Sequence, residues 1–232
     1  MKERTPTMEE RYSRNVPAVS MEDMEKLRRS RVLVAGCGGL GGFIIEYLAR
    51  MGVGSIIAAD GDVFCESNLN RQILSTVNKM GANKALAAAE RVRDINPGVH
   101  VHAVPEFLTK ENAASLLADV DLVMDALDNI AARHILEDAA AQAGLAIVHG
   151  AICGWDLQVM LVPAGSGRLH QLYPEGASPS SKTSLPFTPA ACAALQAAIA
   201  VRYLCGRTAD TDRELHVGSL RDLSLDSVPF GD

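Results

Sequence analysis

Basic and amide side chains gather between residues 67 and 84, after the second apolar segment of the chain. An arginine such as Arg71 offers a planar fork that binds phosphate oxygens through two parallel hydrogen bonds. Lys84 falls in the first turn of an expected helix, where its ammonium would join the positive end of the helix dipole. The amides of Asn68 and Gln72 add neutral donors. Together these residues predict a triphosphate site, although each basic residue taken singly is also typical of a solvated surface.

A glycine-rich segment precedes these residues. It spans residues 36–41 with the sequence GCGGLG, which fits the pattern G-x-G-x-x-G between an apolar run and an expected helix. In that context the glycines permit a tight turn, close approach of a phosphate and close helix packing. The segment predicts nucleotide binding, and by itself it does not distinguish NAD, FAD and ATP.

Carboxylates end two of the apolar segments. Asp60 and Asp62 follow the second segment, where a carboxylate normally holds ribose hydroxyls, although Asp-Gly-Asp is also good turn chemistry. Asp128 and Asn129 follow the fourth segment, at the expected carboxyl edge of a sheet. Asp128 would there hold Mg²⁺ bridging phosphates, because Mg²⁺ prefers hard oxygen ligands. The alternative role for Asp128 is the N-cap of the next helix.

Short apolar runs alternate with longer helical stretches, which is the rhythm of βαβ units. The pattern predicts strands over residues 31–35, 55–60, 99–104, 121–126, 145–150, 157–162 and 214–220. It predicts helices over residues 21–30, 41–51, 84–95, 110–117, 130–143 and 189–204. We therefore expect an α/β protein with a Rossmann-like, doubly wound sheet. The sheet should be mostly parallel at first, with added, antiparallel strands in the C-terminal part.

The amino-acid composition bears on the partners and the cellular location of the protein. The net charge of −6 argues against a broad nucleic-acid surface. The five cysteines include no C-x-x-C pair, which argues against a disulfide framework or a zinc ribbon and favours the cytoplasm. The first 14 residues lack the apolar core of a signal peptide. The apolar stretch over residues 189–205 is interrupted by Gln196 and Arg202, so we expect a buried helix and no membrane span.

The order and spacing of these motifs resemble those of the ThiF/MoeB/HesA family, bacterial relatives of the ubiquitin-activating enzymes. The resemblance rests on Arg11–Arg14, Gly36–Gly41, Asp60-x-Asp62, Asn68-x-x-Arg71-Gln72, Lys84 and Asp128-Asn129. It runs from about residue 11 to residue 154 and resumes over residues 195–204. Each motif is weak alone, and the ordered set is specific.

The resemblance implies that the chain adenylates the C-terminal glycine carboxylate of a small ubiquitin-like sulfur carrier ending in Gly-Gly. Such a reaction consumes MgATP and releases pyrophosphate, in thiamine, molybdopterin or related sulfur metabolism. The implied nucleotide site comprises Gly36, Gly38, Gly39, Gly41, Asp60, Asp62, Asn68, Arg71, Gln72, Lys84, Asp128 and Asn129. Arg14, Arg71, Lys84 and Asp128, which binds Mg²⁺, would act in catalysis. Arg14 matches an arginine that reaches across a homodimer into the partner's ATP site.

The resemblance also implies one domain over residues 1–232. Residues 1–30 would form an N-terminal arm and helix, and residues 31–154 the nucleotide-binding half. Residues 155–232 would form the carrier-binding half, with a mobile crossover loop at about residues 163–189. Many family members bind structural zinc with two C-x-x-C pairs, and this chain has neither, so we expect no zinc. The crossover loop lacks cysteine, and we predict adenylation without a covalent intermediate at Cys153 or Cys192.

Other functions stay open at this point. A related enzyme would adenylate another carboxylate, such as a peptide terminus or a modified tRNA base, although the acidic balance disfavours tRNA. An NAD-dependent oxidoreductase would use Asp60 but would leave Arg71, Lys84 and Asp128 without a role. A non-catalytic partner subunit would keep the fold and lose the charged residues, which are intact here.

Overall fold

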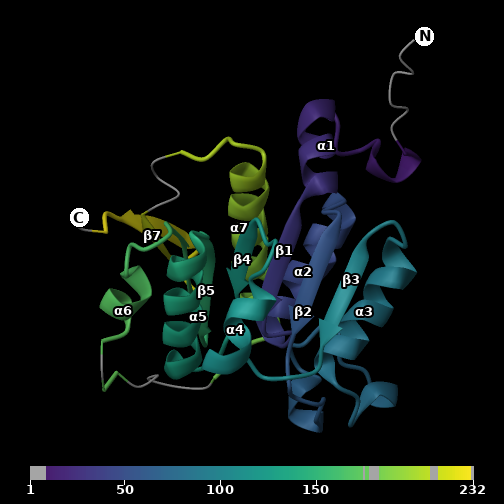
Figure 1. Cartoon of the computed structure of the whole chain (residues 1–232). Coiled ribbons are helices and arrows are strands. Elements are labelled where there is room, and N and C mark those ends of the chain that lie inside the picture. The colour runs from purple at the N-terminus through teal and green to yellow at the C-terminus, as the bar shows by residue number, and fades with distance from the viewer. Residues whose placement is uncertain (1–8, 175, 178–182, 210–213, 231–232) are drawn as a thin grey trace.

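One mixed sheet organises the chain (Figure 1). The computed structural model describes residues 9–174, 176–177, 183–209 and 214–230. Within them the strands are β1 (Arg31–Ala35), β2 (Ser55–Ala59), β3 (His100–Val104), β4 (Leu122–Asp125), β5 (Ile147–Cys153), β6 (Asp156–Val162), β7 (Leu215–Ser219) and β8 (Ser224–Val228). Their order in the sheet is β3-β2-β1-β4-β5-β6-β7-β8. The first five strands in that order pair in parallel, and β6, β7 and β8 pair antiparallel. This arrangement confirms the fold class predicted from the sequence.

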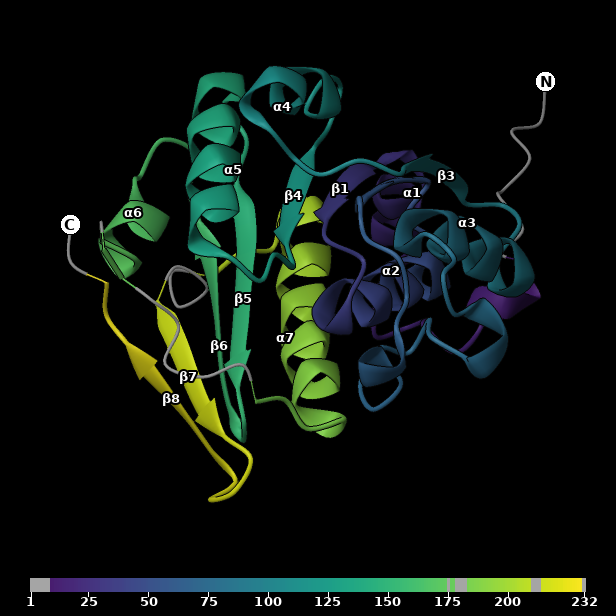
Figure 2. The ribbon, with the colours of Figure 1, turned by 90° about the horizontal axis from the view of Figure 1, so that it is seen from below.

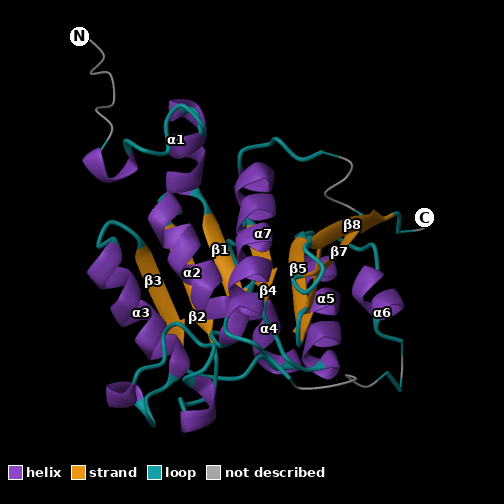
Figure 3. Cartoon of the chain, turned by 180° about the vertical axis from the view of Figure 1, so that it is seen from behind, coloured by secondary structure: helices purple, strands orange, loops and turns teal. Residues whose placement is uncertain are grey.

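Helices cover both faces of the sheet (Figures 2 and 3). They are α1 (Met21–Arg29), α2 (Gly39–Met51), α3 (Lys84–Ile95), α4 (Lys110–Leu116), α5 (Ile130–Ala143), α6 (Arg168–Leu172) and α7 (Phe187–Leu204), with short 3₁₀ turns at Glu10–Tyr12, Glu66–Asn68 and Val77–Lys79. One core lies between the sheet and α2, α3 and α7, and the other lies between the sheet and α4, α5 and α6. These two layers hold the strand ends rigidly, which is what a site at those ends needs.

Helix α7 carries the apolar stretch that the sequence analysis predicts to be buried. Among the described residues it is the one helix long and apolar enough to cross a membrane. Here it packs into the larger core, where Cys192, Ala193 and Ala200 are fully buried. Gln196, also fully buried, donates hydrogen bonds from Nε2 to the backbone oxygens of Asp125 and Val148. The polar residue that interrupts the apolar stretch therefore ties α7 to the last residue of β4 and to the second residue of β5.

Two elements are not predicted from the sequence, and two helices start earlier than predicted. The region predicted as a crossover loop contains α6, whose N-cap makes no side-chain hydrogen bond. Strand β8 is missed because its five residues are all exposed and show no apolar alternation. Its place is set by antiparallel pairing with β7. Helix α2 begins at Gly39, two residues before the predicted start, because its glycines allow the helix to start close to the end of β1. Helix α7 begins at Phe187, also two residues before its predicted start, because Pro189 is tolerated in the first turn of a helix.

Candidate active site

A cleft of about 770 Å³ opens at the carboxyl ends of the parallel strands. Strand β1 lies between β2 and β4, so the chain leaves β1 in one direction and later returns on its other side. Such a switch point is where doubly wound sheets bind ligands. The cleft has two ends. One is lined by the glycine segment and by residues between 59 and 84, and the other continues over β5, β6 and β7.

The glycine segment is built for close packing. Gly36 has φ +94°, and a Cβ there would lie 2.6 Å from the backbone oxygen of Ala126. A Cβ on Gly41 would lie 1.8 Å from the oxygen of Gly36, so only glycine lets α2 start so close to β1. Gly38 is the N-cap of α2 and offers no side chain to the first turn, while Gly39 lines the cleft. The N-terminus of α2 therefore presents its amides to an anion.

Asp60 lies at the end of β2 and fixes the glycine segment. Its two carboxylate oxygens accept hydrogen bonds from the backbone N–H groups of Cys37, at 2.7 Å, and Asp62, at 2.8 Å. Burial raises the pKa of Asp60, because removal from water disfavours its charge, and the two N–H donors oppose that effect. The carboxylate also lines the cleft, in the position where a ribose would lie.

Lys84 is held ready in the cleft wall. It is the first residue of α3, which begins at the N-cap Asn83. The side chain is only 8% exposed, and Nζ lies 2.9 Å from Oδ2 of Asp62. Asp62 therefore neutralises and orients a nearly buried ammonium that also lines the cleft. Asp62 therefore contributes to the site by holding the Lys84 ammonium in position.

The segment between β2 and α3 places its three predicted residues differently. Arg71 lines the cleft, and its Nη1 donates hydrogen bonds within its own loop to the backbone oxygen of Ser67 and to Oδ1 of Asn70. Gln72 also lines the cleft, is 6% exposed, and its buried Oε1 has no hydrogen-bond partner among the described residues. Asn68 is buried outside the cleft lining, where Oδ1 accepts from the N–H of Cys65. An orphaned buried oxygen beside a glycine-lined cleft is a feature of a site that binds a ligand.

Of the two polar residues after β4, Asn129 caps helix α5 and Asp128 lines the cleft. Asn129 is the N-cap of α5, where Oδ1 accepts from the N–H of Ala132 at 2.8 Å. The alternative cap role that the sequence allowed for Asp128 therefore belongs to its neighbour. Asp128 is exposed and lines the cleft, and no described residue forms a hydrogen bond or ion pair with its carboxylate. It is a free hard-oxygen ligand at the cleft.

Arg14 lies on the N-terminal arm, away from the cleft of its own chain. The arm is anchored through Asn96, which accepts from Nη1 of Arg11 and donates to the hydroxyl of Tyr12, both at 2.8 Å. Arg14 follows this anchor and is exposed. Among the described residues it makes no hydrogen bond or ion pair.

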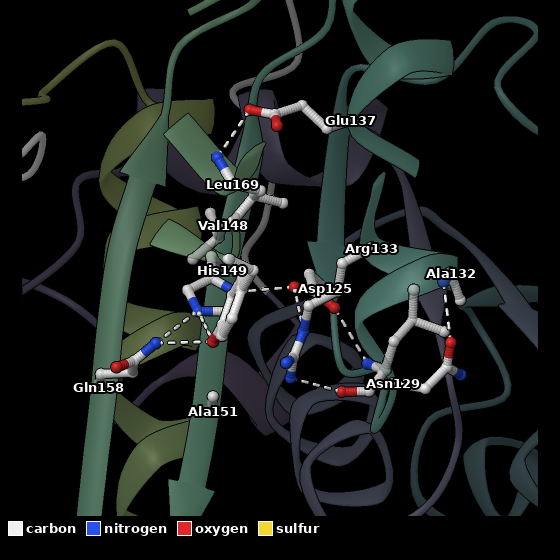
Figure 4. A network of polar contacts seen from close by, with 12 residues as sticks. Asp125, Asn129, Ala132, Arg133, Glu137, Val148, His149, Ala151, Gln158 and Leu169 are labelled. Atoms are coloured by element: carbon white, nitrogen blue, oxygen red, sulfur yellow. Dashed lines mark hydrogen bonds and ion pairs between the residues drawn. The ribbon is translucent and has the colours of Figure 1, made fainter. Parts of the chain in front are cut away.

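A buried polar network crosses the floor of the cleft, and the sequence analysis does not predict it (Figure 4). Asp125, fully buried at the end of β4, accepts from Nε of Arg133 at 3.2 Å and lies 2.7 Å from Nδ1 of His149. Arg133 also donates to the oxygen of Leu127. Burial dominates the shift of His149 and lowers its pKa. Burial acts to raise the pKa of Asp125, but Arg133 and His149 outweigh it and hold that pKa below its usual value. The network is an ionised Asp–Arg pair with a neutral imidazole.

Two residues from the C-terminal half complete the network. Gln158 on β6 places Nε2 2.7 Å from the hydroxyl of Tyr173 and 3.1 Å from Nε2 of His149. The Tyr173 hydroxyl lies 3.1 Å from the same imidazole nitrogen, and burial raises its pKa to about 12. Both residues line the cleft. The sequence shows only that Asp125 stands at the end of a predicted strand, and its partners lie too far along the chain to be recognised.

The cysteines offer one thiol to the cleft. Cys153, at the end of β5, lines it, whereas Cys192 lies fully buried in α7. Burial raises the pKa of Cys192 far above its usual value, so its thiol stays protonated and unreactive. Burial likewise raises the pKa of Cys37 in the glycine segment. Among the described residues, no group of three or more His, Cys, Asp and Glu side chains is arranged to hold a metal ion.

The fold and the cleft define a nucleotide-binding α/β enzyme. The chain belongs to the ThiF family, whose sequence profile matches residues 12–228. It is 39% identical over 211 residues to a sulfur carrier protein adenylyltransferase of Thermus thermophilus, with 85% of this chain and 78% of that protein covered. It is 35% identical over 233 residues to the SAMP-activating enzyme E1 of Haloferax volcanii, with 97% and 86% covered. The chain is thus an adenylyltransferase, an enzyme that transfers AMP.

Solved structures share the fold. Escherichia coli MccB matches with a TM-score of 0.82 at 17% identity, over 97% of this chain and 70% of that one. The tRNA N6-threonylcarbamoyladenosine dehydratase TcdA of E. coli matches with a TM-score of 0.70 at 24% identity, over 85% and 95%. At these identities the likeness shows the fold alone.

Proposed function

We propose that this protein uses ATP to adenylate the C-terminal carboxylate of a small ubiquitin-like sulfur carrier ending in Gly-Gly. The observation that carries the proposal is the composition of one cleft. Its nucleotide end is lined by the α2 N-terminus, Arg71, Lys84 and Asp128, and the cleft continues over Ala151, Gln158 and Val217, where a second substrate would bind. Sequence relatives named for sulfur carrier and SAMP activation support a protein carboxylate as that substrate.

The main requirement of the proposed reaction is that the site offsets the negative charges of its two substrates. A carboxylate is already ionised at neutral pH, so its attack on the α-phosphorus of ATP needs no general base. The anionic nucleophile and the triphosphate repel each other, and the site must offset that repulsion. Lys84, oriented by Asp62, and the forked guanidinium of Arg71 are the cations that line the nucleotide end. Asp60 would hold the ribose while keeping the glycine segment in place.

The residues of the cleft fit a magnesium ion. Asp128 supplies an unpaired carboxylate, and Mg²⁺ is commonly bound by one or two carboxylates together with substrate phosphates. When bound, Mg²⁺ would neutralise charge on the phosphates. The orphaned Oε1 of Gln72 and the amides of the α2 N-terminus would contact the nucleotide directly or through water.

We further propose a cytoplasmic homodimer with two composite sites. Arg14 is exposed on an anchored arm and is remote from its own cleft, so it is free to enter the cleft of a second copy. Residues 31–154 would bind the nucleotide, and residues 155–232 would bind the carrier. Asn68, buried outside the cleft lining, would act on the phosphates only by supporting the loop that carries Arg71.

Pyrophosphate exchange tests the proposal. The protein is mixed with ATP, MgCl₂, labelled pyrophosphate and candidate carriers ending in Gly-Gly, and label entering ATP is measured. Carrier-dependent exchange, abolished when the carrier lacks its terminal Gly-Gly, is the expected result. Exchange that depends on a modified tRNA or a free peptide instead would support the alternative carboxylates. Absence of exchange with every carboxylate, alongside tight NAD binding, would overturn the proposal.

A further inference from the structure

The acceptor end of the cleft is a strip of sheet surface across three strands. Ala151 on β5 pairs with Gln158 on β6, which in turn pairs with Val217 on β7, and all three line the cleft. Directly paired residues point to the same face of a sheet. The strip therefore has one amide, Gln158, between a small and an apolar side chain.

The orientation of the Gln158 amide is decided by its neighbours. The carboxylate of Asp125 can only accept, so Nδ1 of His149 carries the proton and Nε2 is left as an acceptor. The NH₂ group of Gln158 donates to the Tyr173 hydroxyl oxygen at 2.7 Å and faces Nε2 of His149 at 3.1 Å, where it shares the single lone pair of that nitrogen with the Tyr173 hydroxyl. The amide oxygen therefore faces away from the network, as Figure 4 shows for Gln158 and His149.

The oxygen of Gln158 is an acceptor without a donor. No described residue donates a hydrogen bond to Oε1, although Gln158 lines the cleft. Its nitrogen is held on two sides, so the amide cannot rotate to offer a donor without breaking the network. A partner at this point must supply an N–H or O–H group.

Tyr173 is itself fixed from several directions. The Arg133 guanidinium lies over its ring at 4.9 Å, and Nε2 of His134 lies 2.9 Å from its backbone oxygen. It follows α6, whose first N–H groups, of Leu169 and His170, donate to the buried carboxylate of Glu137 at 2.9 Å each. Glu137 thus anchors α6 and, through it, the hydroxyl that sets the Gln158 amide.

We propose that Gln158 is a specificity-determining residue whose Oε1 accepts a hydrogen bond from a backbone N–H in the C-terminal segment of the substrate. This inference rests on the proposed function and adds one contact by which the enzyme would recognise the C-terminal segment of the carrier. An extended segment lying over Ala151 and Val217 presents a backbone N–H at every other residue to one side, whereas a carboxylate or a phosphate presents only acceptors. Tyr173, His149 and Glu137 act through Gln158 and are positioning residues.

Replacement of single amides by esters in the substrate tests this contact. The carrier that supports exchange is made by ligation, with an ester in place of each of its last four peptide bonds in turn. For the wild-type enzyme, one ester is expected to raise the KM for the carrier about tenfold, with little change in kcat or in the KM for ATP. If no ester raises the KM, the inference fails.

A double-mutant cycle distinguishes the contact from general damage. Gln158→Leu and Gln158→Met keep volume and remove the acceptor, and thermal unfolding reports whether each variant folds. Either variant should raise the KM of the all-amide carrier about tenfold and lose the penalty of the critical ester. Tyr173→Phe, which releases the amide, should show part of this effect.

Two failures are distinguishable. If the ester penalty persists in full in both Gln158 variants, Gln158 does not make the contact, although carrier-dependent exchange would still uphold the proposed function. If the wild-type enzyme shows no exchange with any carrier, the proposed function itself fails and takes the inference with it.

Discussion

At the scale of single residues, the cleft assigns different duties to groups that look alike in the sequence. Lys84 and Lys79 are five residues apart, yet Lys84 is buried against Asp62 in the cleft wall and Lys79 pairs with Glu90 outside the cleft lining. Asp125 and Asp128 are three residues apart, yet the Asp125 carboxylate is fully buried with three hydrogen-bonding partners, whereas no described residue pairs with the carboxylate of Asp128. Environment, more than residue type, separates binding groups from supporting ones.

Lys84→Ala should reduce carrier-dependent exchange about 100-fold in kcat/KM, because loss of one preorganised charge costs about 3 kcal/mol of transition-state stabilisation. Lys79→Ala is the matched control and should stay close to wild type, since exposed ion pairs contribute little. Full activity of the Lys84 variant would show that the phosphate clamp lies elsewhere.

The thiols should play no covalent part. Cys192→Ser is expected to retain exchange, because the thiol is buried and protonated, its pKa being raised by burial. No thioester between the enzyme and its carrier should be trapped at low pH and detected by non-reducing electrophoresis. A trapped adduct that disappears on Cys192→Ser or Cys153→Ser would contradict this expectation.

His149 should make stability depend on pH. Burial lowers its pKa below 6.5, so just below pH 6.5 the unfolded chain binds a proton that the folded protein refuses. The unfolded state binds more protons in that window, and the free energy of unfolding therefore falls as the pH falls. His149→Gln, which does not titrate, should have a shallower slope between about pH 7.5 and about pH 5.5 in urea unfolding. The other histidines contribute equally to both proteins, so equal slopes would exclude this role.

At the scale of elements, α6 is held by another helix and not by its own sequence. It has five residues, no side-chain cap and a single buried residue, Leu169. Its N-terminus is satisfied by Glu137 of α5, which lies beside it (Figure 3). A helix this short would not persist in isolation. Its position, and with it Tyr173, depends on one buried carboxylate.

Glu137→Ala should therefore release α6. We expect the amides of Leu169 and His170 to exchange with deuterium about tenfold faster or more, because both N–H groups lose their buried carboxylate acceptor. Asp138→Asn disturbs only an exposed contact to His170 and should change exchange little. Equal effects of the two substitutions would argue against Glu137 as the anchor.

At the scale of the whole molecule, each active site of the proposed dimer contains residues from both chains. The nucleotide end of the cleft holds Arg71 and Lys84 from its own chain, and Arg14 lies elsewhere on the surface. Arg14→Ala and Asp128→Ala should each abolish most exchange as separate proteins. An equal mixture of the two, after subunit exchange, should recover about a quarter of wild-type activity, since half the dimers carry one intact site. No recovery, with mixed dimers demonstrated, would contradict the composite site.

Much of the fold follows from local sequence. The helices over residues 84–95 and 130–143 agree with the structure to the residue, because Asn83 and Asn129 cap helical stretches that follow them. The glycine segment and the residues after each strand also indicated a nucleotide cleft. The two elements that the sequence does not predict, α6 and β8, carry no signal in their own residues. They are held in place by contacts with α5 and β7, respectively.

The sequence by itself determined a doubly wound sheet and the presence of a nucleotide end, since periodicity, caps and glycine spacing act between near neighbours along the chain. Only the tertiary structure decided how the acceptor end is built. Asp125, His149, Gln158 and Tyr173 are separated by up to 48 residues, and their protonation and amide orientation are set by one another. Hydrogen-bond direction is a property of the assembled network, so no single residue in the chain discloses it.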